Sequence, residues 1–264
     1  MRLTVLCLFL GLFAACTKPP VNVSIPFAAQ FASESLGCAE QSGDRQLTDL
    51  RFYVQDVQLI TADGHAVAVS LDADDKWQQR DLALLDFEDG SGSCMNGTDE
   101  TNKSLRGAVP DREYRGLSFT VGVPFERNHA DPLQAKAPLG DPAMHWHWRA
   151  GYKFMRAGIR TADDGFWLHL GSTGCEGTVR NITACNSENR VRVVLTNFEL
   201  GRDAVVVDLA ALTSGTRLDD GVPTDCSSGP AEVTCAEPFR ALGLEFPTGE
   251  SASEQKLFRL EEAK

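Results

Sequence analysis

The sequence predicts an all-β fold, a single β-sandwich-like domain with long functional loops and disulfides. Many short stretches alternate apolar and polar residues, as strands with one buried face do. Clusters of Gly, Asp, Asn and Pro separate these stretches at fairly regular intervals, which is typical of a sandwich or barrel. The expected strands are Leu50–Ile60, His65–Leu71, Leu82–Phe87, Tyr114–Val121, Tyr152–Thr161, Phe166–Leu170, Arg190–Phe198 and Ala204–Leu209.

The first expected strand contains one interruption of its pattern. Phe52 and Val54 share one parity, whereas Val57 and Leu59 share the other. Such a change of phase predicts a β-bulge. Helical periodicity is absent over long windows, and residues 204–212 and 251–263 are the helix candidates.

The first 15 residues are expected to be a signal peptide outside the fold. Arg2 precedes an apolar stretch, Leu3–Phe13, that is too short to span a bilayer. The small residues before Cys16 resemble a bacterial lipobox, so Cys16 is expected to be lipidated. Residues 16–26 are interpreted as a tether and 27–264 as the domain. Thr17 after the lipidated cysteine favours the outer membrane, and hence a periplasmic or cell-surface location.

The remaining cysteines are even in number, and in an exported chain they indicate three disulfides. Short loops favour the pairs 175–185 and 226–235, which leaves 38–94. The residues concerned are Cys38, Cys94, Cys175, Cys185, Cys226 and Cys235. A cysteine-rich metal site is the alternative, but no CxxC spacing supports it.

The charge of the chain excludes some partners. The formal net charge is −12, which argues against nucleic acid and against anionic lipid as partners, so the lipid anchor is the one expected membrane contact. Asp86, Glu88 and Asp89 are interpreted as a solvated acidic loop, with a calcium site as the alternative. The motifs of hydrolases, nucleotide-binding enzymes and zinc proteases are missing, so the chain is not expected to be an enzyme.

The segment Met144-His145-Trp146-His147-Trp148 brings together side chains that could bind a metal ion or an aromatic ligand. If it continues into one strand, both tryptophans share a face with Tyr152, and both histidines lie on the other face. Imidazole suits copper, zinc, nickel and iron, and a thioether selects Cu(I).

Other interpretations of this segment stay open. The tryptophans could be core residues or a platform on which a sugar or peptide stacks. The histidines could be ordinary surface residues, and Met144 could fill the core. A metal-dependent enzyme would need a general base, and no residue is nominated for that role.

An ordered series of short motifs resembles the metallo-mystery pair family, the WxW, four-Cys proteins related to the periplasmic partner encoded beside methanobactin genes. The series covers most of the mature chain and is more specific than any one motif. Its members are Phe52-Tyr53-Val54-Gln55-Asp56-Val57, Leu84-Leu85-Asp86-Phe87, Gly122-Val123-Pro124-Phe125 with Asn128-His129, Met144–Trp148, Gly151-Tyr152-Lys153-Phe154 and His169-Leu170-Gly171-Ser172-Thr173-Gly174-Cys175.

This resemblance implies a copper-binding protein that acts in copper acquisition or handling. It implies a MauG-type diheme peroxidase as partner, which oxidises one tryptophan of the WxW pair, Trp146 or Trp148, to kynurenine. Within the matching motifs, His129 and His169 are the implied ligands. His147 occupies the variable position of WxW, so it and His145 are candidates for additional ligands, together with Met144. Folding is expected to gather His129, His169 and both indoles into one pocket.

Overall fold

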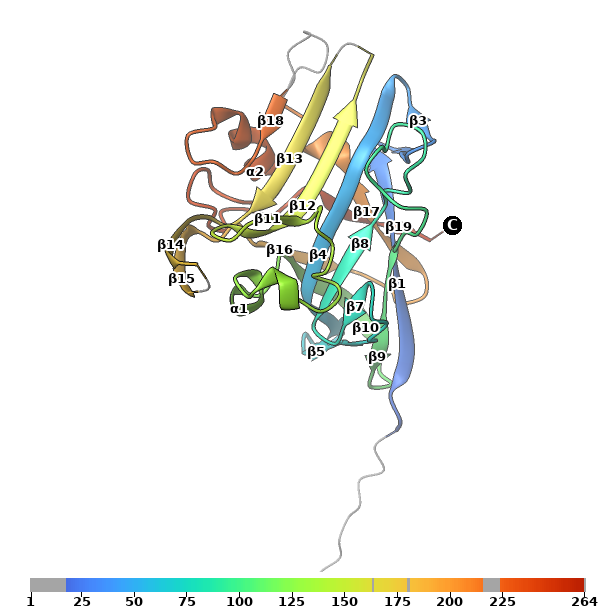
Figure 1. Cartoon of the computed structure of the whole chain (residues 1–264). Coiled ribbons are helices and arrows are strands. Elements are labelled where there is room, and N and C mark those ends of the chain that lie inside the picture. Colours follow the sequence, from blue (N-terminus) through green and yellow to red (C-terminus); the bar gives the residue numbers. More distant parts are fainter. Residues whose placement is uncertain (1–17, 163, 180, 216–223, 264) are drawn as a thin grey trace, which may run out of the picture.

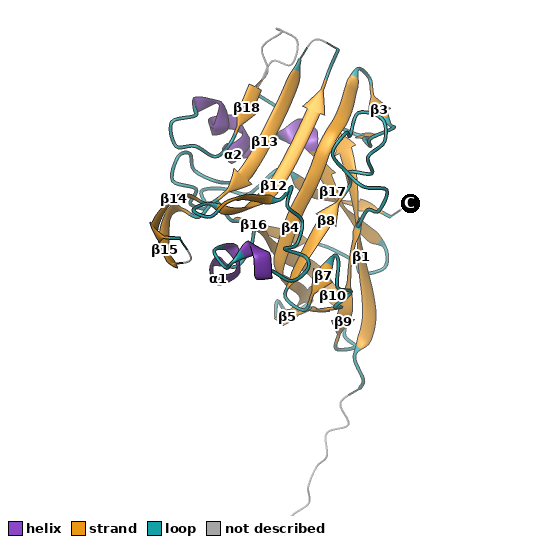
Figure 2. Cartoon of the chain, viewed as in Figure 1, coloured by secondary structure: helices purple, strands orange, loops and turns teal. Residues whose placement is uncertain are grey.

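The computed structural model of the chain describes residues 18–162, 164–179, 181–215 and 224–263. The expected signal peptide 1–15 and lipidation site Cys16 lie outside these residues. The described part is built from strands with a few short helices, so the predicted all-β fold class is confirmed (Figure 2). Among the described helices, none has the length and apolar character that crossing a membrane requires.

The larger sheet has 11 strands within the described residues (Figure 1). These strands are β3 (Gln41–Ser42), β4 (Arg45–Thr61), β5 (Ala66–Ala68), β7 (Gln78–Gln79), β8 (Leu82–Asp86), β10 (Tyr114–Val121), β11 (His145–His147), β12 (Gly151–Arg160), β13 (Gly165–Gly171), β16 (Val191–Thr196) and β18 (Thr224–Cys226). Its main path runs β16-β10-β4-β12-β13-β18, with the short strands added beside β4, β8 and β12. The long strand β4 is therefore the centre of the sheet.

The smaller sheet follows the order β19-β17-β1-β9-β6, with β2 beside β1. Its strands are β1 (Val21–Phe31), β2 (Glu34–Ser35), β6 (Ser70–Leu71), β9 (Ser104–Val109), β17 (Asp203–Asp208) and β19 (Phe258–Glu262). In the described part, a hairpin of β14 (Thr173–Thr178) and β15 (Asn181–Ser187) pairs with neither sheet. The helical elements are α1 (Phe125–Asn128), α2 (Ala236–Ala241) and the 3-10 turns η1 (Pro132–Gln134), η2 (Leu209–Ala211) and η3 (Val233–Cys235).

Aromatic side chains join the two sheets in one core. The ring of Phe27 on β1 lies 5.8 Å from the ring of Phe119 on β10, measured between centroids. The ring of Phe258 on β19 lies 5.3 Å from Phe119 and 5.6 Å from Phe52 of β4. Contacts of this kind between the faces of two sheets define a sandwich.

Each predicted strand overlaps an observed strand, and the bulge is confirmed. The pairing of β4 with β10 shifts between Ser118 and Thr120, opposite Asp56, whose φ is 53°. One predicted strand, His65–Leu71, is divided at Val69, because β5 pairs with β4 whereas β6 pairs with β9. The two halves of this segment therefore belong to different sheets.

Two expectations about the chain ends are wrong. The helix candidate 251–263 instead contains β19. The other candidate, 204–212, contains β17, as its strand interpretation predicts, followed by the 3-10 turn η2. β17 and β19 pair antiparallel and bury Val205 and Phe258. The tether interpretation of 16–26 fails from Val21 onward, because β1 begins there and pairs with β9. The prolines around β1 hid an alternating apolar pattern in which Val23 and Ile25 are buried.

The three predicted disulfides are confirmed. The described cysteines pair as Cys38–Cys94, Cys175–Cys185 and Cys226–Cys235. The second bridge joins residues that lie directly opposite each other on β14 and β15. It therefore closes the hairpin that stands apart from both sheets.

Candidate metal centre

The candidate site lies where β11, the start of β12, α1 and the β14–β15 hairpin come together (Figure 1). The expectation that Met144–Tyr152 continues as one strand is wrong, since the chain turns between β11 and β12. His145 pairs with Tyr152, and His147 pairs with Gly151. Consequently the ring of Tyr152 packs against His145 at 5.2 Å, and not on the face of the tryptophans.

Asn128 at the end of α1 fixes this turn. Its side-chain amide donates to the carbonyl of Ala150 at 3.0 Å, and its Oδ1 accepts from the backbone N–H of Tyr152 at 2.8 Å. Gly151 between them has a φ of +81°, and a Cβ there would lie 2.3 Å from the Asn128 carbonyl oxygen. The neighbouring His129 is thereby placed beside the turn.

His129 is partly buried, and its surroundings favour the neutral imidazole. Its ring packs on Phe125 at 4.8 Å, its Nε2 lies 3.2 Å from Asn128 Nδ2, and its Nδ1 is buried without a hydrogen-bond partner. Burial lowers the pKa of His129, and the positive charge of Arg190 lowers it further. A neutral imidazole is the form that binds metals.

His169 on β13 has, like His129, a buried ring nitrogen without a hydrogen-bond partner. Its Nε2 is buried without a hydrogen-bond partner, and its ring lies 6.2 Å from the indole of Trp146. Burial lowers the pKa of His169 to about 4, with help from the charges of Arg156 and Lys153. Because buried polar atoms are normally paired, an unpaired and neutral imidazole nitrogen fits the requirements of a metal ligand.

The other predicted site residues have different surroundings. Trp148 is 38% exposed and lines a hollow of about 180 Å³ with His129 and His145, named here the Trp148 hollow. Trp146 and His147 line a second hollow of about 360 Å³ beside β14, the Trp146 hollow. Met144 is fully buried and belongs to the hydrophobic core, which is the alternative considered for it.

His147 is exposed, and its Nδ1 faces the backbone of the turn. The N–H groups of Arg149 and Ala150 approach this atom at 3.3 and 3.4 Å. One ring nitrogen is thus used to hold the turn, which leaves Nε2 free to bind a ligand. The structure therefore places Trp146 with His169 and His147, and Trp148 with His129 and His145. That one ion joins the two groups stays a prediction.

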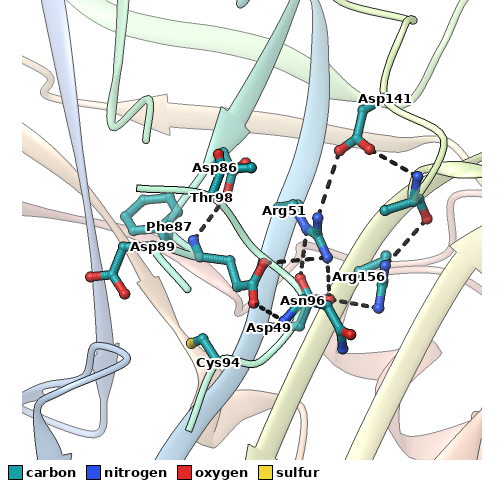
Figure 3. Close-up of polar contacts among 12 residues, drawn as sticks. Asp49, Arg51, Asp86, Phe87, Asp89, Cys94, Asn96, Thr98, Asp141 and Arg156 are labelled. Atoms are coloured by element: carbon teal, nitrogen blue, oxygen red, sulfur yellow. Dashed lines mark hydrogen bonds and ion pairs between the residues drawn. The ribbon is translucent and has the colours of Figure 1, made fainter. Parts of the chain in front are cut away.

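A buried charged cluster next to the site is the feature that sequence reasoning missed (Figure 3). Arg51 on β4 donates to both carboxylate oxygens of Asp49, at 2.9 and 2.7 Å. Asp49 also binds Arg156 at 2.7 Å, and Glu88 lies 3.7 Å from Arg51. Arg156 pairs with His169 across β12 and β13, and its charge lowers the pKa of that imidazole, whereas the charge of Asp49 opposes this shift.

Asp86 and Glu88 belong to this cluster, and the interpretation of them as a solvated loop is wrong. Asp86 is 4% exposed and Glu88 is fully buried. Asp86 Oδ1 accepts from the Glu88 N–H, and Glu88 Oε1 accepts from the Asn96 N–H. Burial raises the pKa of both, that of Asp86 to about 7. The sequence did hold a signal, since Asp49 and Arg51 share one parity directly before the apolar run Phe52-Tyr53-Val54.

The raised pKa of Asp86 predicts a pH-dependent stability. Between its usual pKa of 3.8 and the folded value of about 7, the native state holds a proton that the unfolded chain releases. The free energy of unfolding contributed by this group therefore falls as the pH rises through that window. Asp86→Asn removes the titration, so this variant should gain stability relative to the native chain as the pH rises, with a plateau above the window.

Urea unfolding across the window measures this difference. The exposed Asp99→Asn substitution is the matched control and should show no comparable trend. A stability difference between Asp86→Asn and the native chain that does not change with pH would contradict the prediction.

Comparison with known proteins agrees with the resemblance seen in the sequence. The MbnP family model matches residues 20–228. The solved structure of MbnP from Methylosinus trichosporium superposes with a TM-score of 0.81 and 28% sequence identity, over 94% of this chain and 100% of that one. No curated protein sequence matches the chain. On the extent of the family match and this superposition, the chain belongs to the MbnP family.

Proposed function

We propose that this protein is an exported copper-binding protein that acts in copper acquisition or handling. In this proposal it is the substrate of a MauG-type diheme peroxidase, which converts Trp146 to kynurenine, and is itself no enzyme. The observation that carries the proposal is the buried Nε2 of His169, which has no hydrogen-bond partner and lies beside the Trp146 indole.

The oxidation would give the tryptophan a ligand atom that it lacks. The indole N–H only donates and offers no lone pair to a metal. Kynurenine exposes an aryl amine, which has one. Two peroxide equivalents supply two oxygen atoms to the indole, and water then releases the displaced carbon as formate. The side chain thereby gains one oxygen and loses one carbon.

The surroundings of the indole support this role. Trp146 packs edge-on against His169, and a Cβ at residue 171 would lie 3.2 Å from the indole, so Gly171 leaves room for the ring. The ammonium of Lys153 lies 5.9 Å from the same ring. His129 would complete the ligand set, with His145 and His147 as further candidates. Copper would supply binding and redox chemistry there, and its soft Cu(I) form accepts nitrogen donors.

The proposed location follows the expected lipid on Cys16. The protein would be anchored to the outer membrane and face the periplasm or the cell surface, where an exported heme enzyme reaches it. Trp146 lines an open hollow, which supports access by an oxidising partner.

The test is co-expression with a MauG-type peroxidase from the same organism, followed by intact mass and metal analysis. The native chain should gain one oxygen, lose one carbon and carry stoichiometric copper. Trp146→Phe should abolish both changes, whereas the matched Trp148→Phe should keep them. His169→Ala should keep the modified mass and lose copper affinity by about tenfold or more.

Copper retained in Trp146→Phe, or unchanged affinity in His169→Ala, would contradict the proposal. His65→Ala is the control for histidine loss, since that side chain is 77% exposed. The alternative of a surface module that stacks on a sugar or peptide is favoured by one observation, the 38% exposure of Trp148. It would be supported if Trp148→Ala lost ligand binding in a chain that never takes up metal.

A further inference from the structure

A disulfide lies against the predicted ligand His129. The Nε2 of His129 is 3.4 Å from Cys185 Sγ, and Cys185 is bonded to Cys175. The potential ligand atoms of His129, Cys175 and Cys185 all lie within 4.8 Å of one another. Within the described residues, this is the group of such side chains that lies close enough to hold a metal ion. In the disulfide state, only the imidazole of this group can bind a cation.

The nitrogen of His129 that faces this group carries a lone pair, which accepts from Asn128 and which a metal ion would take over. Asn128 Oδ1 accepts from the Tyr152 N–H, which fixes the orientation of the amide, so Asn128 Nδ2 can only donate to His129 Nε2. Nε2 therefore carries no hydrogen, and neither does the disulfide sulfur facing it. The contact between Nε2 and Cys185 Sγ thus joins two acceptors and is not a hydrogen bond.

This bridge is also the most accessible of the three in the described part. Cys185 is partly exposed, whereas the cysteines of the other two bridges are all buried, at 5% exposure or less. The β14–β15 hairpin stands outside both sheets, so a reductant can approach it at the surface (Figure 1). Because thiol–disulfide exchange requires a thiolate to reach a sulfur, Cys185 is the site of first attack.

We propose that reduction of Cys175–Cys185 creates an alternative metal site, in which His129 and two thiolates bind a thiophilic ion, above all Cu(I). In this state His129 serves the new site instead of the copper centre proposed above. A dithiol reductant supplies two electrons and two protons: the Cys175–Cys185 bond breaks, both sulfurs become thiols, and the reductant closes its own disulfide. Binding of the ion then releases the two thiol protons to solvent.

The fold keeps the donors together after reduction. Backbone pairing of β14 with β15 from Thr173–Ser187 to Thr178–Asn181 holds the two cysteines opposite each other. Asn128 keeps His129 in place through its two bonds to the turn. Two thiolates and an imidazole form a soft donor set, which favours Cu(I) and Zn²⁺ over hard cations. This site does not require kynurenine, so it does not rest on the proposed function.

The experiment uses the mature chain produced without a peroxidase, with both tryptophans shown intact by mass. Anaerobic treatment with limiting dithiothreitol, removal of the reductant and alkylation mapping should show that Cys175 and Cys185 open first. Cu(I) is then titrated against a chromophoric Cu(I) chelator. The reduced protein should bind one additional equivalent compared with the disulfide form.

Three variants complete the test. Cys175→Ser/Cys185→Ser should lose the reduction-dependent equivalent, and His129→Ala should weaken it by about tenfold or more. His65→Ala is the control for histidine loss, because this side chain is 77% exposed and lies outside the cluster. Circular dichroism of each disulfide-form variant checks folding.

Equal Cu(I) uptake before and after reduction, prior opening of another bridge, or unchanged affinity in a folded His129→Ala would each overturn the proposal. Failure of the kynurenine proposal would leave these results unaffected, since no modified tryptophan takes part in them.

Discussion

Arg51→Met is expected to destabilise the protein by about 3–5 kcal/mol, the usual cost of removing one partner from a buried ion pair. The Arg51 side chain is 3% exposed and binds Asp49 through two hydrogen bonds. Glu88, at 3.7 Å, and Asp141, at 3.6 Å, also depend on its charge. Methionine fills a similar volume but leaves these carboxylates without their shared cation.

Urea unfolding of the variant and of the native chain measures this loss. Arg202→Met is the matched control, because Arg202 pairs with Glu199 on the surface with 58% of its side chain exposed. Such exposed pairs contribute about 0–1 kcal/mol. If Arg51→Met lost as little stability as the control, the charge of Arg51 would not be needed to stabilise the buried carboxylates.

Gly151→Ala is expected to destabilise the fold by about 2–4 kcal/mol and to displace His129. This cost combines the overpacking by the new Cβ with an unfavourable φ. At φ +81° an alanine is strained, and its Cβ would lie 2.3 Å from the Asn128 backbone oxygen and 2.5 Å from its side-chain oxygen. Asn128 must then move and release the turn that it binds. Under the proposed function, the affinity for copper should fall together with stability.

Gly64→Ala separates the cost of the strained φ from the cost of the contact between the new Cβ and Asn128. Gly64 has a φ of +86° and nothing within 4 Å of the position of a Cβ. Its substitution should therefore show the backbone cost alone, about 1 kcal/mol. If thermal unfolding of the two variants gave equal losses, the contact with Asn128 would contribute nothing to the stability of the turn.

Local patterns predicted the strands well because alternation is a property of neighbouring residues. The phase change between Val54 and Val57 marked the bulge at Asp56, and loop length predicted the disulfide pairs. Prediction failed where long-range pairing decides the structure. β1 pairs with β17 and β9, both far from it in the sequence, so local pattern alone assigns its first residues, 21–26, to a tether.

The candidate site was predicted only in part for the same reason. The motifs named His129, His169 and the two tryptophans, but the turn between β11 and β12 decides which histidine each indole meets. The turn depends on Asn128, 24 residues before Tyr152 in the chain. The buried partners of Arg51 were likewise hidden, because Glu88 lies in a segment whose composition is that of an exposed loop.

The isolation of the β14–β15 hairpin makes local unfolding possible there. In the described part, β4 has partner strands on both sides, so its amide protons are expected to exchange more slowly than those of the hairpin. The hairpin pairs with no third strand, and its opening breaks few contacts elsewhere. The hairpin is therefore expected to fluctuate on its own while the sandwich stays closed. Its disulfide limits the amplitude of this motion.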